Sequence, residues 1–240
     1  MKRICIGLVG DFHENMYTHV ALNNAVEHCR QHLDFQVKAR WVSTATLTET
    51  ISDQNKFQGF WIVPGSPYIN DSAVFETIRW ARENDFPMLG SCGGFQYMVL
   101  EYARNVLGFL DAAHEESGPD ANHPVITKLS CSLKGRQEEV FITDRQSWLY
   151  KILKREKITG HFFCNYGVNP ADQSKLNRHP FAFTAFSREG EARAFELKAH
   201  PFFNGTLFQP SLDSSIENPN PLMLDFFRCC ANSGFSMKNF

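Results

Sequence analysis

The first half of the chain alternates short, continuous apolar segments with longer segments whose apolar residues recur every three or four positions. A continuous apolar run is typical of a parallel strand buried on both faces, and the longer spacing is typical of an amphipathic helix. Strands are predicted at residues 3–9, 35–41, 60–63 and 87–90, and helices at residues 17–32, 72–83 and 95–106. Asp71 or Ser72 is the expected N-cap of the second helix. The alternation predicts a parallel sheet with right-handed crossovers.

The second half of the chain has shorter apolar segments separated by turn residues. Strands are predicted at residues 140–142, 181–187, 192–197 and 206–208, and a closing helix at residues 221–232. The turn-forming residues 188–191 separate two of these strands and predict a hairpin. Because no linker, repeat or low-complexity segment interrupts the pattern, we expect one α/β domain over residues 1–240.

Composition and charge exclude several classes of partner. Hydrophobic residues make up 43% of the 240 positions, and the formal net charge is −2 without a basic block. A nucleic-acid partner would need clustered Lys and Arg, so none is expected. The apolar runs fall far short of the roughly 20 residues of a membrane helix, and the first is too short for a signal-peptide core. We therefore expect a cytoplasmic protein that does not bind membranes.

The seven cysteines are expected to be reduced thiols in that location. None of them forms a Cys-x-x-Cys pair, so neither a metal ion nor a cofactor is expected. Six fit the pattern of small buried residues. Cys92 is the exception because of its neighbours.

Residues 90–94, Gly-Ser-Cys-Gly-Gly, fit a nucleophile elbow, in which a strand turns sharply into a helix. Small flanking residues are needed there because larger side chains would collide with the strand or helix. The N-terminal N–H groups of the following helix favour a thiolate at Cys92 and can stabilise an oxyanion. The alternative is a glycine-rich turn with an incidental cysteine.

A second loop, Val-Pro-Gly-Ser-Pro at residues 63–67, ends the preceding strand. Gly65 would let backbone N–H groups of this loop, including that of Ser66, approach a reacting carbonyl. By itself the segment is better explained as an ordinary Pro/Gly turn.

Taken in order, these motifs resemble the class I glutamine amidotransferase family, and within it the glutaminase domains of CTP synthases. The resemblance covers nearly the whole chain, through residues 6–10, 63–67, 87–96, 123–126, 166–169, 200–203, 205–210 and 219–222. It implies a three-layer, flavodoxin-like α/β fold with a mostly parallel central sheet. It also implies a Cys-His-Glu triad in which the cysteine attacks the side-chain amide of glutamine and ammonia is released.

The triad implied by the resemblance is altered in this chain. The family's Phe-His-Pro-Glu segment reads Phe-Gln-Pro-Ser here, so Gln209 and Ser211 occupy the positions of the catalytic His and Glu. A glutamine amide has no useful basicity near neutral pH, and general acid–base catalysis is typically worth about 10²–10⁴-fold. The family's ordinary proton relay is therefore not expected to operate.

The resemblance also assigns the substrate pocket. It places Gly65, Ser66, Gly93, Gln96, Asn165 and Tyr166 around the oxyanion and the substrate. Asn165 stands where the family usually has an arginine that helps to hold glutamine, and Gly93 where a larger apolar residue is common. Both changes indicate a pocket adapted to another ligand, or drift after loss of function.

Histidines elsewhere in the chain are candidates for a replacement base. His161 and His114 are the leading ones, and His123, His179 and His200 are further candidates. For each of them, a surface or structural histidine is the simpler interpretation.

Three functions remain open at this point. The chain is a cysteine-dependent amidase with a non-standard proton relay, or an inactive relative that binds a small amide, an amino acid or a partner protein. As a third alternative, it is a glutaminase subunit serving a separate synthetase, because it contains no Walker-type loop for ATP. A homodimer is a further expectation.

Overall fold

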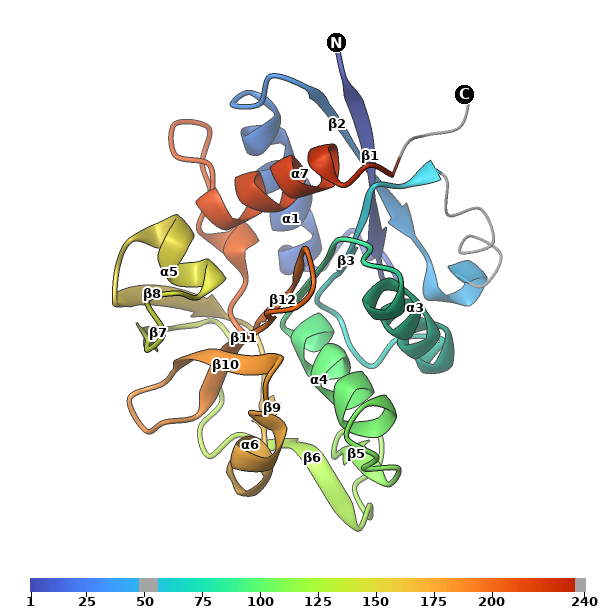
Figure 1. Cartoon of the computed structure of the whole chain (residues 1–240), viewed down its shortest axis with the longest axis vertical. Helices are drawn as coiled ribbons and strands as arrows, with labels where there is room; N and C mark the ends of the chain where they lie inside the picture. Colours follow the sequence, from blue (N-terminus) through green and yellow to red (C-terminus); the bar gives the residue numbers. More distant parts are fainter. Residues whose placement is uncertain (48–55, 236–240) are drawn as a thin grey trace.

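Five strands form the parallel part of the main sheet in the computed structural model, which describes residues 1–47 and 56–235. Their order is β2 (Gln36–Val42), β1 (Arg3–Val9), β3 (Gly59–Ile62), β4 (Met88–Ser91) and β12 (Phe203–Thr206) (Figure 1). The parallel α/β arrangement predicted for the first half of the chain is confirmed. The carboxyl ends of these strands meet at one edge, which is where ligand sites form in such sheets.

The same sheet continues with four antiparallel strands. They follow in the order β11 (Ala192–Leu197), β10 (Phe181–Phe186), β7 (Arg136–Ile142) and β8 (Lys157–Phe162). The predicted hairpin is confirmed, since β10 and β11 pair antiparallel across residues 188–191. The strand predicted at residues 206–208 was misplaced, because β12 begins at Phe203 and Thr206 is its last residue. Asn204 and Gly205 interrupt the apolar pattern there, although both are buried.

Two pairs of helices cover the two faces of the sheet (Figure 1). On one face, α1 (Tyr17–Arg30) and α7 (Pro221–Asn232) pack over Ile4, Ile6 and Leu8 of β1. On the other face, α3 (Asp71–Glu83) and α4 (Gly93–Asn105) belong to the core that contains Cys5 and Val9 of the same strand. This is the three-layer α/β fold that the sequence predicted, because alternate residues of a strand face opposite layers.

Several short elements lie outside the predicted pattern. A small sheet contains β5 (Ala112–His114), β6 (His123–Lys128) and β9 (Tyr166–Val168), and two short helices are α5 (Trp148–Leu153) and α6 (Pro170–Leu176). Two single turns of 3₁₀ helix, η1 (Thr44–Thr46) and η3 (Pro210–Leu212), complete the described elements. These segments are short and partly exposed, so they show no clear hydrophobic period.

The predicted cap of α3 was wrong. Asn70 is the N-cap, and its side-chain oxygen accepts a hydrogen bond from the Ala73 N–H at 3.1 Å. The carboxylate of Asp71 instead accepts hydrogen bonds from the Tyr68 N–H at 3.0 Å and the Tyr97 hydroxyl at 2.7 Å. Asp71 therefore ties α3 to the loop after β3 and to α4.

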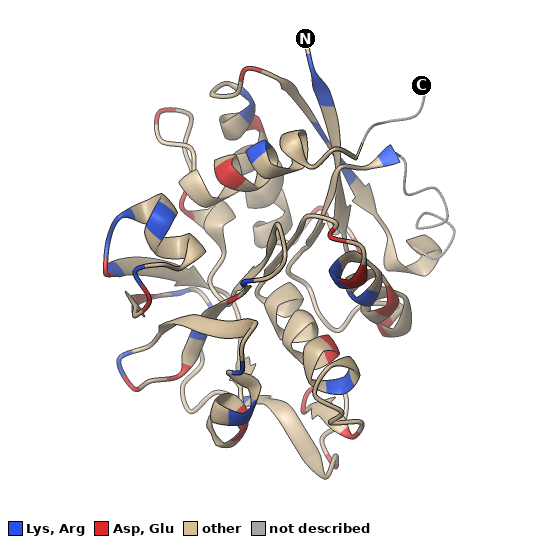
Figure 2. Ribbon diagram, in the orientation of Figure 1, with Lys and Arg blue, Asp and Glu red and all other residues tan. Residues whose placement is uncertain are grey.

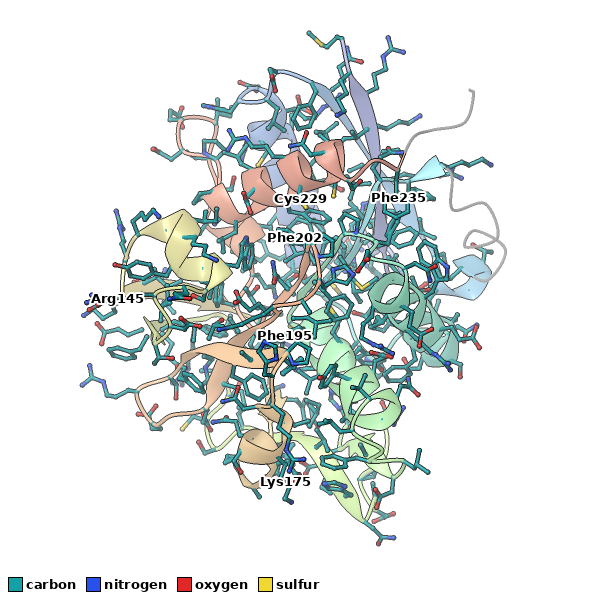
Figure 3. All side chains as sticks on the ribbon, in the orientation of Figure 1. Arg145, Lys175, Phe195, Phe202, Cys229 and Phe235 are labelled. Carbon is teal, nitrogen blue, oxygen red and sulfur yellow. The ribbon has the colours of Figure 1, made fainter. Side chains whose placement is uncertain are left out.

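Charged residues of both signs are interspersed along the chain (Figure 2). Among the described residues, no helix is long and apolar enough to cross a membrane. The interior is strongly aromatic: Phe195 lies beside α4 (Figure 3), with its ring centroid 5.4 Å from that of Phe95 and 4.6 Å from that of Phe181. The expectation of a single domain over residues 1–240 stays a prediction.

One buried ion pair connects the two helices of the second face, and it yields a stability prediction. Arg82 on α3 donates to both carboxylate oxygens of Glu101 on α4, at 2.8–3.2 Å, and the Glu101 side chain is fully buried. Arg82→Ala would leave that carboxylate buried without its cation, so we expect the free energy of unfolding to fall by about 3–5 kcal/mol in urea denaturation.

Arg79→Ala is the matched control on the same helix. Arg79 pairs with Glu83, and both side chains are exposed (57% and 44%). Such a pair contributes about 0–1 kcal/mol. Equal losses of stability in the two variants would contradict the importance assigned to the buried pair.

Candidate active site

Cys92 occupies the sharp turn between β4 and α4. Its backbone has φ 54° and ψ −110°, the left-handed region that L-residues rarely adopt, and it is the N-cap residue of α4. Its N–H donates to the Thr206 carbonyl of β12 at 3.0 Å, and its carbonyl accepts from the Gln96 N–H at 3.2 Å. The strained conformation is thus held by hydrogen bonds from both sides.

The glycines around Cys92 are required by close packing. A Cβ on Gly94 would lie 2.1 Å from the Ile62 carbonyl oxygen of β3. On Gly90 it would lie 2.4 Å from the sulfur of Met98, and on Gly93 it would lie 2.5 Å from the Ser66 hydroxyl oxygen. These distances agree with the prediction that only small residues fit on both flanks of Cys92.

The loop after β3 is held against the elbow by two polar side chains. Gly65 has φ +118°, a conformation that disfavours other residues. His19 on α1 donates from Nε2 to the Pro64 carbonyl at 2.7 Å, and the Tyr68 hydroxyl donates to the Val63 carbonyl at 2.5 Å. The Ser66 backbone nitrogen lies 3.2 Å from the place that a Cβ on Gly93 would occupy, so the loop and the elbow are in direct contact.

Cys92 opens into a cavity of about 200 Å³. The cavity is lined by residues of the elbow and its helix, the loop after β3, the start of α1, the segment from β8 into β9, and the segments that follow β5, β6 and β12. They are Met16, Thr18, Pro64, Gly65, Ser66, Cys92, Gln96, Glu116, Lys134, Phe163, Cys164, Asn165, Tyr166 and Gln209. Most of the site residues predicted from the sequence are therefore gathered around one cavity. Its two charged side chains are Glu116 and Lys134.

The Cys92 sulfur is surrounded by hydrogen-bonding groups. The thiol of Cys164, the Gly93 N–H and the Gln209 amide lie near this sulfur and lower the pKa of Cys92 in spite of its burial. The Phe163 carbonyl oxygen lies 3.7 Å from the same sulfur. The hydrogen bond with Cys92, together with burial, raises the pKa of Cys164 well above its usual range. The pair therefore favours a thiolate at Cys92 beside a protonated thiol at Cys164.

Gln96 connects the elbow helix to the small sheet. Its Nε2 donates to the Tyr166 carbonyl at 2.7 Å, and its Oε1 accepts from Nε2 of His114 at 3.0 Å. The other ring nitrogen of His114 accepts from the Glu116 N–H at 3.2 Å. Burial lowers the pKa of His114 to about 4. His114 is thus a neutral ring with both nitrogens engaged, and its place is beside Gln96, outside the residues that line the cavity.

Gln209, which the resemblance to the family aligns with its catalytic histidine, lines the cavity. It is 1% exposed, and its backbone N–H donates to the His161 carbonyl at 2.8 Å. Within the described part of the chain, neither its side-chain oxygen nor its side-chain nitrogen has a hydrogen-bond partner of normal geometry. Ser211 lies in the following turn, η3, and does not line the cavity.

His161 does not line the cavity that holds Cys92. It contributes to a second cavity of about 400 Å³, together with Arg155, Asp213 and Asn220, and Gln209 lines both cavities. The structure therefore brings neither His161 nor His114 to the wall of the cavity that holds Cys92.

Asn165 and Lys134 line the same cavity. The Asn165 side-chain oxygen accepts from the Ser132 hydroxyl at 2.6 Å, and the Lys134 ammonium lies 5.2 Å from the centre of the Phe163 ring. Lys134 thus brings a positive charge to the cavity that Asn165 lines.

Sequence reasoning missed Cys164, Lys134 and His19. The sequence predicts Cys164 only to be a small buried residue, and no neighbouring motif marks Lys134 or His19. Only the folded chain brings them to the elbow or to its supporting loop. Among the described residues, no cluster of three or more His, Cys, Asp or Glu side chains could hold a metal ion.

The comparison with protein families now places the chain. Residues 16–229 match the family described as "Glutamine amidotransferase class-I". The chain belongs to the class I glutamine amidotransferase family.

Among curated proteins, the chain is similar to CTP synthases. It is 31% identical to that of Methanopyrus kandleri over 96% of this chain and 46% of the relative, and 29% identical to that of Sulfolobus acidocaldarius over 94% and 45%. The chain thus spans just under half the length of these relatives. Among solved structures, the Trypanosoma brucei CTP synthase glutaminase domain with bound acivicin has a TM-score of 0.87 at 23% identity, covering 95% of this chain and 94% of that one.

The hydrogen bond between the two cysteines leads to a prediction for thiol reactivity. Cys164→Ala removes a donor to the Cys92 thiolate, so the pKa of Cys92 should rise. A hydrogen bond to an ionised group contributes about 1.5 kcal/mol or more, so alkylation of Cys92 by iodoacetamide near neutral pH should slow by roughly 10-fold. The measurement is the pH profile of the alkylation rate, followed by peptide mass spectrometry.

Cys164→Ser is the matched control, because a serine hydroxyl still donates. Its profile should stay closer to that of the unmodified protein than the alanine profile does. A Cys164→Ala profile that coincides with the wild-type profile would refute the proposed stabilisation of the thiolate.

Proposed function

We propose that the protein is a cysteine-dependent amide hydrolase whose nucleophile is Cys92 and whose substrate is a small amide with charged groups. The observation that supports this most strongly is the elbow itself. A strained cysteine, whose pKa is lowered by its neighbours, faces a cavity lined with polar groups. A nucleophilic cysteine of this kind forms an acyl-enzyme that water then hydrolyses.

The charged residues of the cavity suggest the class of substrate. Lys134 can bind a carboxylate, and Glu116 can bind an ammonium group, so an amino-acid-like amide fits the pocket best. Lys134 would then take over part of the role that the resemblance assigns to the arginine replaced by Asn165. The Gly93 N–H, at the start of α4, supports an oxyanion on the attacked carbonyl.

Cys164 is the proposed proton carrier of the non-standard relay. Its hydrogen bond to the Cys92 thiolate is the main reason for its raised pKa. When Cys92 becomes acylated, that bond is lost, and Cys164 becomes a better acid as the leaving nitrogen needs a proton. The resulting Cys164 thiolate can then accept a proton from the attacking water, which restores the starting state.

The test of this function compares ammonia release from glutamine and related amides by the wild-type protein and by Cys92→Ala. We expect release by the wild-type protein and a fall to the uncatalysed rate in the variant. Cys131→Ser, at an exposed cysteine outside the cavity, is the control and should keep the wild-type rate. Identical rates for the wild-type protein and Cys92→Ala would eliminate the hydrolase proposal.

A second candidate function is ligand binding without turnover, and the Gln209 amide favours it. Burial of unpaired polar atoms costs about 1–3 kcal/mol each, and a ligand amide could satisfy both atoms of Gln209. In that case an amide ligand would raise the melting temperature equally in the wild-type protein and in Cys92→Ala, with no product formed.

A third candidate is a glutaminase that supplies ammonia to a separate synthetase partner. It is motivated by the matched length, just under half of each CTP synthase relative. Stimulation of ammonia release by an added synthetase would support it. A homodimer remains a proposal that sedimentation or light scattering can test.

Restoring the family's triad gives a further prediction. In Gln209→His with Ser211→Glu, an imidazole would replace the amide that now faces Cys92. We expect glutamine hydrolysis to increase by about 10²-fold or more, as general acid–base catalysis usually provides. Ser211→Glu alone, which places a carboxylate outside the cavity without a base to orient, should change little. A folded double variant with unchanged activity would show that more than the triad separates this pocket from glutamine.

A further inference from the structure

Cys92 and Cys164 form a pair of thiols in one cavity. Cys92 lies at the elbow and Cys164 between β8 and β9, and each is 7% exposed. Both line the cavity of about 200 Å³, and Cys164 directly follows Phe163, whose carbonyl oxygen lies 3.7 Å from the Cys92 sulfur. A small solute that enters the cavity therefore meets both sulfurs.

The segment that carries Cys164 is fixed against the elbow. The Phe163 carbonyl contacts the Cys92 sulfur at 3.7 Å, and the Cys164 carbonyl accepts from the Leu133 N–H at 3.1 Å. The two thiols are therefore neighbours by virtue of the fold rather than through a chance rotamer at the surface.

We propose that Cys92 and Cys164 are a peroxide-sensitive dithiol site, at which a hydroperoxide converts the two thiols into a reversible disulfide. In the first step the Cys92 thiolate attacks the peroxide oxygen, the O–O bond breaks, and the products are a sulfenic acid at Cys92 and an alcohol or water. In the second step the sulfur of Cys164 attacks the sulfenic sulfur, an S–S bond forms, and the hydroxyl leaves as water with the proton of Cys164.

The electron balance of this reaction is complete. Two thiols lose two electrons and two protons in total, and one hydroperoxide molecule takes up both electrons. A dithiol reductant reverses the change by thiol–disulfide exchange.

The environments of the other cysteines make this pair selective. Burial raises the pKa of Cys5, Cys29 and Cys230, as well as that of Cys229 on α7 (Figure 3). Thiols of this kind react slowly with peroxides, because the thiolate is the reactive form. The pKa of Cys92 is lowered instead, and that of Cys164 is raised, so Cys164 stays protonated. Cys164 can then react with a sulfenic acid at Cys92.

The disulfide would occupy the sulfur that the proposed hydrolase uses as its nucleophile. Oxidation would then reversibly block the elbow. The oxidation itself needs no amide turnover, so it can be tested whether or not the protein is a hydrolase.

The experiment treats the whole wild-type protein with a few equivalents of hydrogen peroxide, without substrate, and then blocks free thiols with iodoacetamide. In a sample weighed before the blocking step, we expect a loss of about 2 Da in intact mass, for two hydrogen atoms, and treatment of that sample with dithiothreitol should restore the original mass. The blocked sample should carry two carbamidomethyl groups fewer than untreated protein and yield a peptide in which residues 92 and 164 are linked. In Cys164→Ser, Cys92 should instead accumulate as a sulfenic acid that a 1,3-diketone traps, or proceed to the sulfinic acid.

Cys131→Ser is the matched control at an exposed cysteine outside the cavity, and it should form the 92–164 link like the wild-type protein. The wild-type result decides the proposal even if Cys164→Ser does not fold. Oxidation of wild-type Cys92 to the sulfenic or sulfinic acid while Cys164 stays a free thiol would overturn it. So would peroxide consumption that is no faster at Cys92 than at Cys131.

Discussion

The close packing of the elbow on the strand beside it is the constraint on which the site depends. The backbone of Gly94 passes so near the Ile62 carbonyl of β3 that a single added carbon would lie 2.1 Å from that oxygen. This approach places the first turn of α4 directly over the ends of β3 and β4. It also forces Cys92 into a left-handed conformation, with its side chain in the cavity and the helix N-terminus behind it. The strain at one residue is offset by hydrogen bonds to β12 and within α4.

Neutral groups account for the charge on the Cys92 sulfur. No histidine is among the described residues that line its cavity. A neighbouring thiol, a backbone N–H and a side-chain amide lower the pKa of Cys92, and all three act over a short range in a buried place. The proposed hydrolysis and the proposed oxidation would therefore share one sulfur, because both would depend on the same thiolate.

The histidine candidates show that residue type alone does not identify the side chains that line a cavity. His114 and His161 are the leading candidates for a base in the sequence. Both ring nitrogens of His114 are engaged, one with the Gln96 side chain and the other with the Glu116 N–H. His161 faces the other cavity, and its backbone holds Gln209. On a strand, a change of one residue reverses the direction of the side chain, so proximity along the chain does not decide which cavity a histidine enters.

The sequence by itself determined the parallel half of the fold and the elbow. Both depend on local features, namely continuous apolar strands and small residues at fixed spacing. The second half was less predictable, because β12 contains buried Asn204 and Gly205 and the strands of the small sheet are short. Only the tertiary structure decided that Cys164 and Lys134 share a cavity with Cys92, since they come from segments far apart in sequence. Contacts of this kind arise from how the strands are paired and the connecting segments packed, and no local pattern of residues encodes them.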